Sequence, residues 1–354
     1  KKYMKRREFG KGLLGVAAIS AMPANTNHRQ YTSEKNSNSS PINVFLPLEY
    51  KPPEGTDASD FPFRFIRATL EFLESGFLGQ NIPIWFKKFE EVDFEKRVSN
   101  IASWIMQGVQ KFKKIHPVDP VWVMAQIMHE SYFYEFSVST SLAVGICQFV
   151  SRTAHEFEML CAGDRQEHAK APNKLPEFAL KENDYHQLRQ QKRDFMRANR
   201  LREDLTYKML MEWIAAGKAD ELKPDAEKYF QQQAKLKIFD EQIQKARDDY
   251  IAFVRANLEG RDIFNEDDLN FLLKFDERVT YKKPIFGMIQ MLARALRARN
   301  GYIIAAAAGY NAGLSTTRAE GVFKPYGQIP NFEETVTYLS RVFILHHEIS
   351  KRLG

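Results

Sequence analysis

The sequence is poor in the residues that cross-link small domains and build metal centres. Its 354 residues include only two cysteines, Cys147 and Cys161, which allow at most one disulfide. The sequence contains no zinc-ligand spacing, no phosphate-binding glycine loop and no dinucleotide-binding glycine pattern. A disulfide scaffold is therefore excluded, and neither a zinc site nor a nucleotide site is predicted. Cys147 lies in the apolar run GICQF, which predicts a core thiol rather than a nucleophile.

The sequence also lacks a long apolar run and a convincing β-strand pattern. The weakly apolar run at residues 13–22 is shorter than the roughly 20 residues that a membrane-spanning helix needs. Apolar residues recur instead at helical spacing over most of the chain. We therefore predict a mainly α fold, in a chain long enough for two or three domains.

Charge of one sign is only modestly in excess. Lysine and arginine number 51 against 45 aspartates and glutamates, which gives a net charge of +6. Such a balance favours a polyanionic partner, such as nucleic acid, anionic lipid or an acidic wall polymer, without choosing among them. Because basic residues are interleaved with acidic ones and no nucleic-acid-binding motif is present, we expect no nucleic-acid partner.

Residues 1–24 have the layout of an export signal. A basic start, KKYMKRREFGK, precedes a short apolar run that ends in small residues. The pair Arg6-Arg7 and the residues after it resemble a twin-arginine signal, and a basic amphipathic tail is the alternative. Export predicts a periplasmic protein with no transmembrane helix in the mature chain. Residues 25–59 are rich in Asn, Ser and Pro, which predicts a disordered linker.

The rest of the chain divides by composition. Residues 60–114 carry apolar residues at helical spacing and predict a helical N-terminal segment with two or three helices. Residues 157–274 are far more charged: 12 of the 24 positions from 181 to 204 are charged. The pairs Leu236/Phe239, Ile243/Ala246 and Tyr250/Phe253 repeat every seven residues. This spacing predicts a helical hairpin or a short coiled coil, either packed within the chain or serving as a partner-binding arm.

Glu130 is the candidate catalytic acid. Asp119 and Pro120 are suited to start a helix whose apolar stripe includes Val121, Met124, Ile127 and Met128. Glu130 then falls near the end of that helix, at the edge of its apolar face. Loss of solvation there would raise the pKa of the carboxyl group, so that it could donate a proton near neutral pH. The alternative is an exposed helix glutamate. A second helix is expected from about residue 143.

Three stretches resemble the signatures of the lytic transglycosylases with a lysozyme-like catalytic domain, the soluble lytic transglycosylase or SLT-type family. In the first, HESYFYEFSVSTSLAVGICQFVSRTA, the matching residues are Glu130-Ser131, Ser139, Gly145-Ile146-Cys147-Gln148 and Thr153-Ala154. The second is AAGYNAG at residues 307–313. The third, IPNFEETVTYLSRV, matches at Ile329-Pro330, Glu334-Thr335 and Tyr338. All three occur in the family's order.

The resemblance implies a lysozyme-like catalytic domain formed by residues 115–156 and 275–354, interrupted by a large helical insertion at residues 157–274. It implies Glu130 as the catalytic acid and base. Tyr310 would orient Glu130, Asn311 would shape the sugar groove, and Tyr338 would close the back of the site. Ser139 and Gln148 would contact sugar or acetamido groups.

The sequence departs from the family pattern at four places. Cys147 stands where the family has methionine, Ser151 replaces a proline, and Gly309 replaces an alanine. One residue is added between Ile-Pro and Glu-Thr. None of these changes removes the acid, so they indicate an unusual branch of the family with altered packing of the substrate.

The implied substrate is the peptidoglycan strand, cleaved between N-acetylmuramic acid and N-acetylglucosamine to leave 1,6-anhydro ends, with no metal or cofactor. Between Glu130 and Glu156 the only acidic residue is Glu135. A single carboxylate suits a substrate-assisted route better than hydrolysis by a carboxylate pair. Two alternatives stay open: a muramidase with a second carboxylate from the insertion, and a non-catalytic wall-binding scaffold that recruits a protein partner through the insertion.

Overall fold

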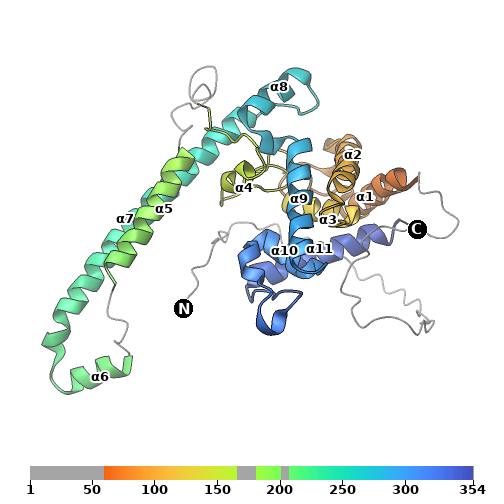
Figure 1. Cartoon of the computed structure of the whole chain (residues 1–354). Helices are drawn as coiled ribbons and strands as arrows, with labels where there is room; N and C mark the ends of the chain where they lie inside the picture. The colour runs from red at the N-terminus through yellow and green to blue at the C-terminus, as the bar shows by residue number, and fades with distance from the viewer. Residues whose placement is uncertain (1–59, 166–180, 201–206, 354) are drawn as a thin grey trace. The chain divides into compact units, whose positions relative to one another are not determined.

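The computed structural model describes residues 60–165, 181–200 and 207–353 (Figure 1). The predicted export signal at residues 1–24 and the predicted linker at residues 25–59 lie outside these ranges. The described residues are mainly helical, as predicted, and contain isolated β-bridges but no strand. No helix within them combines the length and the apolar character that a membrane crossing requires.

The chain forms two compact units. The first comprises the described parts of Lys1–Cys161 and Arg261–Gly354, and the second those of Ala162–Gly260. The division into a catalytic domain and an insertion at residues 157–274 stays a prediction. The helices of the first unit are α1 (Phe61–Phe77), α2 (Phe94–Phe112), α3 (Pro120–Ser131), α4 (Ser151–His155), α8 (Glu266–Phe275), α9 (Lys282–Ala298), α10 (Ile303–Ala312) and α11 (Glu333–Ser350).

Helix α3 is the central helix of the first unit. The Asp119 side chain accepts a hydrogen bond from the Val121 amide at 2.8 Å, and Pro120 occupies the first turn, so the predicted start is confirmed. Every residue from 120 to 128 is buried, on all sides rather than along one stripe. A helix that is apolar all round lies inside a protein, and α3 packs against both α11 and α2.

The predicted N-terminal segment contains two α-helices, α1 and α2, with a short 3-10 turn, Phe89–Glu91, between them. Helix α1 packs on α2 and α11, and α2 also packs on α9. Trp85 is buried, whereas Trp104 is half-buried with its ring edge-on to Phe286. These helices thus form a second layer around the central helix.

The helix expected from about residue 143 is not there. Residues 143–149 form a tight loop, and helix α4 begins only at Ser151. Leu142, Gly145 and Gln148 all have positive φ angles, of 63°, 82° and 49°. A helix cannot continue through such residues. The apolar residues that suggested a helix are buried by the loop instead: Ala143, Val144, Ile146 and Cys147.

The second unit is a helical hairpin, as the seven-residue repeat predicted. Helix α5 (Lys181–Ala198) lies beside α7 (Lys223–Leu258), and α6 (Tyr207–Ala215) and a 3-10 turn (Ala219–Leu222) stand between them in the sequence (Figure 1). Gln232 bonds to the Asn199 carbonyl, and the Phe195 ring meets that of Phe239. Residues later in α5 pair with residues earlier in α7, so the two helices are antiparallel.

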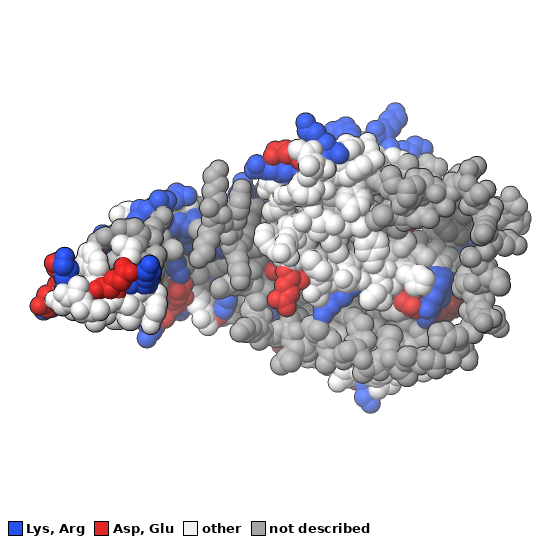
Figure 2. All heavy atoms as spheres, turned by 90° about the horizontal axis from the view of Figure 1, so that it is seen from below, with Lys and Arg blue, Asp and Glu red and all other residues white. Residues whose placement is uncertain are grey.

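Basic and acidic side chains alternate along this hairpin. Residues 162–260 hold 19 lysines and arginines and 18 aspartates and glutamates. On the face that Figure 2 shows, neither sign gathers into a patch on the hairpin. The hairpin surface therefore offers no strong electrostatic attraction to a polyanion.

Candidate active site

Glu130 lies at the C-terminal end of α3 and is half-buried. The next residue, Ser131, is fully buried and donates its hydroxyl to the carbonyl of Ile146 at 3.0 Å. Tyr132 then ends the helix in the left-handed conformation, with φ of 48°. The Glu-Ser pair thus combines a carboxyl group with a hydroxyl that joins the helix end to the Gly-Ile-Cys-Gln motif.

Cys147 contacts Tyr310 and lies close enough to Glu130 to feel its charge. Burial raises the pKa of the Cys147 thiol well above its usual value, and the negative charge of Glu130 raises it further. The Tyr310 hydroxyl donates to the Cys147 carbonyl at 2.7 Å. The structure therefore brings the first two signature motifs together at this cysteine, which stays a neutral thiol. Cys161 is also buried, and neither cysteine forms a disulfide.

Ser139 and Gln148 lie on one loop, residues 137–149, which we call the groove loop. The Ser139 hydroxyl accepts the Ala143 amide at 3.0 Å and lies 3.0 Å from the hydroxyl of Ser141. The Gln148 amide nitrogen donates to the Gly145 carbonyl at 2.9 Å. Ser139 is only 8% exposed, so much of its hydrogen bonding supports the loop itself.

The second and third motifs also meet. The Thr335 hydroxyl donates to the side-chain oxygen of Asn311 at 2.9 Å. Tyr338 is buried one turn further along α11, and its ring stands edge-on to the ring of His129, with centroids 4.9 Å apart. Tyr338 therefore contacts the residue immediately before Glu130. The roles of Asn311 and Tyr338 in binding sugar stay predictions.

A buried ion pair supports the groove loop, and sequence reasoning missed it. Arg278 and Asp276 have fully buried side chains and form two bonds, Nε to Oδ1 at 2.9 Å and Nη2 to Oδ2 at 2.6 Å. Nη1 of Arg278 reaches the Phe149 carbonyl and the Ser151 hydroxyl, at 3.3 and 3.1 Å. In the sequence the pair is only one Asp-x-Arg among many charged residues, which gave no signal.

Glu135 forms a buried ion pair with Arg97. Its carboxylate accepts both Nη2 and Nε of Arg97, at 2.7 and 3.1 Å, and its side chain is 1% exposed. Nη1 of the same arginine bonds the Asp93 carbonyl. A carboxylate that accepts two charge-assisted hydrogen bonds and is shielded from solvent stabilises the packing of the elements that it joins.

Residues 105–181 match the family model of the transglycosylase SLT domain. The chain carries a transglycosylase SLT domain. The matched range contains Glu130, Ser139 and Gln148, whereas Tyr310, Asn311 and Tyr338 lie beyond it. No curated protein and no solved structure matches the chain. An SLT domain indicates a transglycosylase or lysozyme-like activity related to peptidoglycan, and hence an extracytoplasmic place of action.

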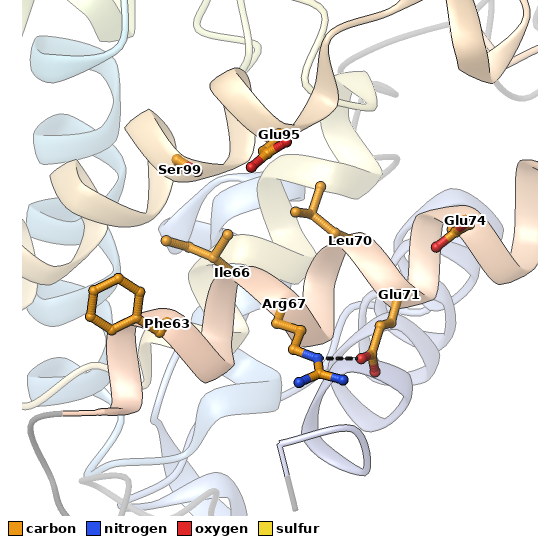
Figure 3. Close-up of a pocket in the computed structure, with 8 residues that line it drawn as sticks. All are labelled: Phe63, Ile66, Arg67, Leu70, Glu71, Glu74, Glu95 and Ser99. Carbon is orange, nitrogen blue, oxygen red and sulfur yellow. Dashed lines mark hydrogen bonds and ion pairs between the residues drawn. The ribbon is translucent and has the colours of Figure 1, made fainter.

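The pocket shown in Figure 3 lies outside the residues that match the SLT domain. It is an open groove of about 590 Å³ between α1 and α2, with the paired Arg67 and Glu71 on one side. None of its lining residues is a predicted site residue. Its lining consists of Phe63, Ile66, Arg67, Leu70, Glu71, Glu74, Glu95 and Ser99.

His129, next to the candidate acid of the SLT domain, predicts a pH dependence of stability. Burial, and then the positive charge of Arg341, lower the pKa of His129 from 6.5 to about 4. At a pH between these two pKa values, His129 is protonated in the unfolded chain and neutral in the folded chain. Stability should therefore fall as the pH drops from about 6.5 to 4, by about 2–3 kcal/mol from this residue.

Urea unfolding of the wild type and of His129→Gln, measured from pH 4 to 7, checks this expectation. The variant should lose much of the slope, and His347→Gln, which changes an exposed histidine at the end of α11, should keep it. Equal slopes in wild type and His129→Gln would show that His129 is not held neutral by the fold.

Proposed function

We propose that the protein is a peptidoglycan lytic transglycosylase with Glu130 as its single acid and base. The observation that carries the proposal is the position of Glu130, where the Gly-Ile-Cys-Gln motif and the Tyr-Asn motif meet around Cys147. Glu135, the next acidic residue along the chain, is occupied by Arg97. This arrangement supports one reacting carboxyl group rather than a flanking pair.

The proposed reaction needs one proton carrier and no water. Glu130 gives its proton to the oxygen between N-acetylmuramic acid and N-acetylglucosamine, and the bond from that oxygen to C1 of the muramyl ring breaks. The carbonyl oxygen of the 2-acetamido group stabilises the positive charge that develops at C1. Ionised Glu130 then takes the proton of the muramyl 6-hydroxyl as its oxygen bonds to C1. The enzyme regains its proton, and the fragment ends in a 1,6-anhydro ring.

The surrounding residues suit this chemistry. Glu130 is half-buried near a neutral, buried thiol. Such surroundings solvate an ionised carboxylate poorly and favour the protonated acid that the reaction needs. We propose that Tyr310 keeps the Cys147 segment against Glu130, and that Gln148 and Asn311 bind acetamido and hydroxyl groups. Ser139 would shape the loop that carries Gln148, and Tyr338 would close the site behind His129.

The proposed location is the periplasm, to which the predicted twin-arginine-like signal at residues 1–24 would direct the chain. The substrate is a polymer whose stem peptides carry carboxylates. A net charge of +6 favours association with such a polyanion. Both arguments agree with an enzyme that acts on the cell wall.

Recruitment of a protein partner through the hairpin is a second candidate function, and one observation favours it. Helix α6 has no buried residue, although it is rich in apolar side chains. Tyr207, Met211 and Ile214 are 77%, 43% and 52% exposed. Their i, i+4, i+7 spacing is the pattern that an amphipathic helix presents to an apolar groove. A wall-bound scaffold would use this face without any chemistry at Glu130.

The test is mass analysis of the sugar fragments that the purified full chain releases from isolated peptidoglycan. Anhydromuramyl ends, one water lighter than hydrolysis products, are the expected result. Reducing ends would show hydrolysis. The protein would then be a muramidase, with a second carboxylate still to be identified. No fragments, together with retained binding to the wall, would move the function to recruitment through the hairpin.

A further inference from the structure

The groove loop has a conformation that its own sequence does not favour. Leu142 and Gln148 are non-glycine residues with φ of 63° and 49°, and such backbone conformations carry a cost. Bonds within the loop, such as the Gly145 amide to the Ser137 carbonyl at 2.9 Å, close its turns. They do not attach the loop to the rest of the protein. Contacts from outside the loop must therefore hold it in place.

Arg278 provides such contacts. Its Nη1 lies 3.3 Å from the Phe149 carbonyl, 3.5 Å from the Leu142 carbonyl and 3.1 Å from the Ser151 hydroxyl. The two carbonyls flank the segment that contains Gly145 and Gln148. One guanidinium thus spans the part of the loop that the Gly-Ile-Cys-Gln motif occupies.

Asp276 fixes the direction of that guanidinium. It accepts Nε and Nη2 of Arg278, which leaves Nη1 to face the loop. Asp276 also accepts the backbone amide of Arg278 at 3.0 Å, so the main chain is held as well. A fork of this kind has a defined geometry that a lysine ammonium cannot reproduce.

The backbone of Arg278 completes the attachment. Gly145 packs so closely on it that a Cβ atom at Gly145 would lie 1.8 Å from the Arg278 carbonyl oxygen. The φ angle of 82° at Gly145 is a second reason for glycine at this position. Side chain and main chain of Arg278 therefore hold the groove loop from the same side.

We propose that Arg278 is a positioning residue for substrate binding, which acts through the groove loop on Gln148 and Ser139. This inference rests on the proposed function, because it assumes that the loop contacts the glycan strand. Arg278 is fully buried and touches no substrate itself. Ser131 and Tyr310 also bond to the loop, at the Ile146 and Cys147 carbonyls, but Arg278 bonds to the carbonyls at its Leu142 and Phe149 positions. Without the Arg278 fork, the backbone at Leu142 and Gln148 relaxes towards ordinary φ angles, and the Gln148 side chain leaves its binding position.

The test is a double-mutant cycle in the full chain that carries Glu130→Gln, so that ligand is bound without being cleaved. Calorimetry measures the affinity for a GlcNAc-MurNAc tetrasaccharide with Arg278→Lys, with Gln148→Ala and with both. Arg278→Lys should weaken binding about tenfold, the effect of roughly one lost hydrogen bond. The double variant should bind no more weakly than the weaker single variant, because both changes remove the same contact.

Two controls separate positioning from general destabilisation. His346→Gln breaks a different, partly buried pair, with Asp119 at the far end of α3, where the atoms are 2.7 Å apart. It should leave the affinity unchanged. Hydrogen exchange of amides 137–149 should speed up in Arg278→Lys and not in His346→Gln.

Each outcome decides the inference. The inference would be overturned if the affinity losses of the two single variants multiplied in the double variant. It would also be overturned if Arg278→Lys left the hydrogen exchange of the groove loop unchanged. If the Glu130→Gln protein with Arg278 intact does not bind the tetrasaccharide, the proposed function fails. In that case the exchange rates alone decide whether Arg278 holds the loop.

Discussion

Replacing Glu130 with glutamine should slow the release of glycan fragments about 10²–10⁴-fold, the usual contribution of a positioned general acid and base. Glutamine has nearly the same shape and keeps a polar side chain, but its amide protons are far too weakly acidic for general acid catalysis. Glu130 is half-buried at a helix end, so the change should leave the fold intact. The measurement is the initial rate of fragment release from isolated peptidoglycan, normalised to folded protein.

Glu135→Gln is the matched control, because it removes the next carboxylate along the chain. Glu135 is paired with Arg97 and almost fully buried, so its loss should lower stability rather than the rate per folded molecule. If Glu135→Gln abolished cleavage in a protein that remained folded, the single-carboxylate mechanism would be wrong. The same conclusion would follow if Glu130→Gln kept its full rate.

Asp276→Ala should destabilise the first unit by about 3–5 kcal/mol, because it leaves the guanidinium of Arg278 buried without a counter-charge. This loss is a large fraction of the free energy of unfolding of a typical native protein, which is about 5–15 kcal/mol. Both side chains of the pair are 0% exposed, so water cannot replace the lost carboxylate. Urea unfolding, followed by a signal from the first unit, measures the loss.

Two comparisons make this prediction specific. Asp276→Ala combined with Arg278→Met should recover much of the lost stability, since a buried ion pair can be replaced by apolar groups at little cost. Glu71→Ala breaks the pair with Arg67, whose side chains are 81% and 44% exposed, and should cost less than about 1 kcal/mol. A loss below about 1 kcal/mol for Asp276→Ala would mean that burial of Arg278 is not what makes the pair important.

Arg278 and Arg97 show why the site was only partly predictable. Both are arginines with a carboxylate partner, and nothing in their sequence neighbourhoods separates them from exposed pairs. Their importance comes from burial and from the groups they hold: the groove loop for one, and the carboxylate of Glu135 for the other. Burial is a property of the packed chain, so a local pattern cannot reveal it.

The wrong helix at residue 143 has a similar cause. Apolar residues from 143 to 149 favour burial, and short apolar runs do not distinguish a helix from a buried loop. The loop with positive φ angles at Leu142 and Gln148 is bonded by Ser139 and Arg278, and the Arg278 backbone packs closely on Gly145. These partners lie on both sides of the chain segment that forms the hairpin, and the sequence did not predict their contact.

The sequence by itself determined the mainly α class, the start of α3 at Asp119 and Pro120, the helical hairpin, and the three motifs with Glu130 among them. These follow from spacing along a helix, from capping chemistry and from motif order, all of which are local. Tertiary structure alone decided that Cys147 lies beside Glu130 and Tyr310, that Glu135 is occupied by Arg97, and that Arg278 holds the groove loop. Each of these contacts joins residues that are distant in the sequence and that become buried together when the chain folds. Desolvation turns ordinary charges and hydroxyls into determinants of the site.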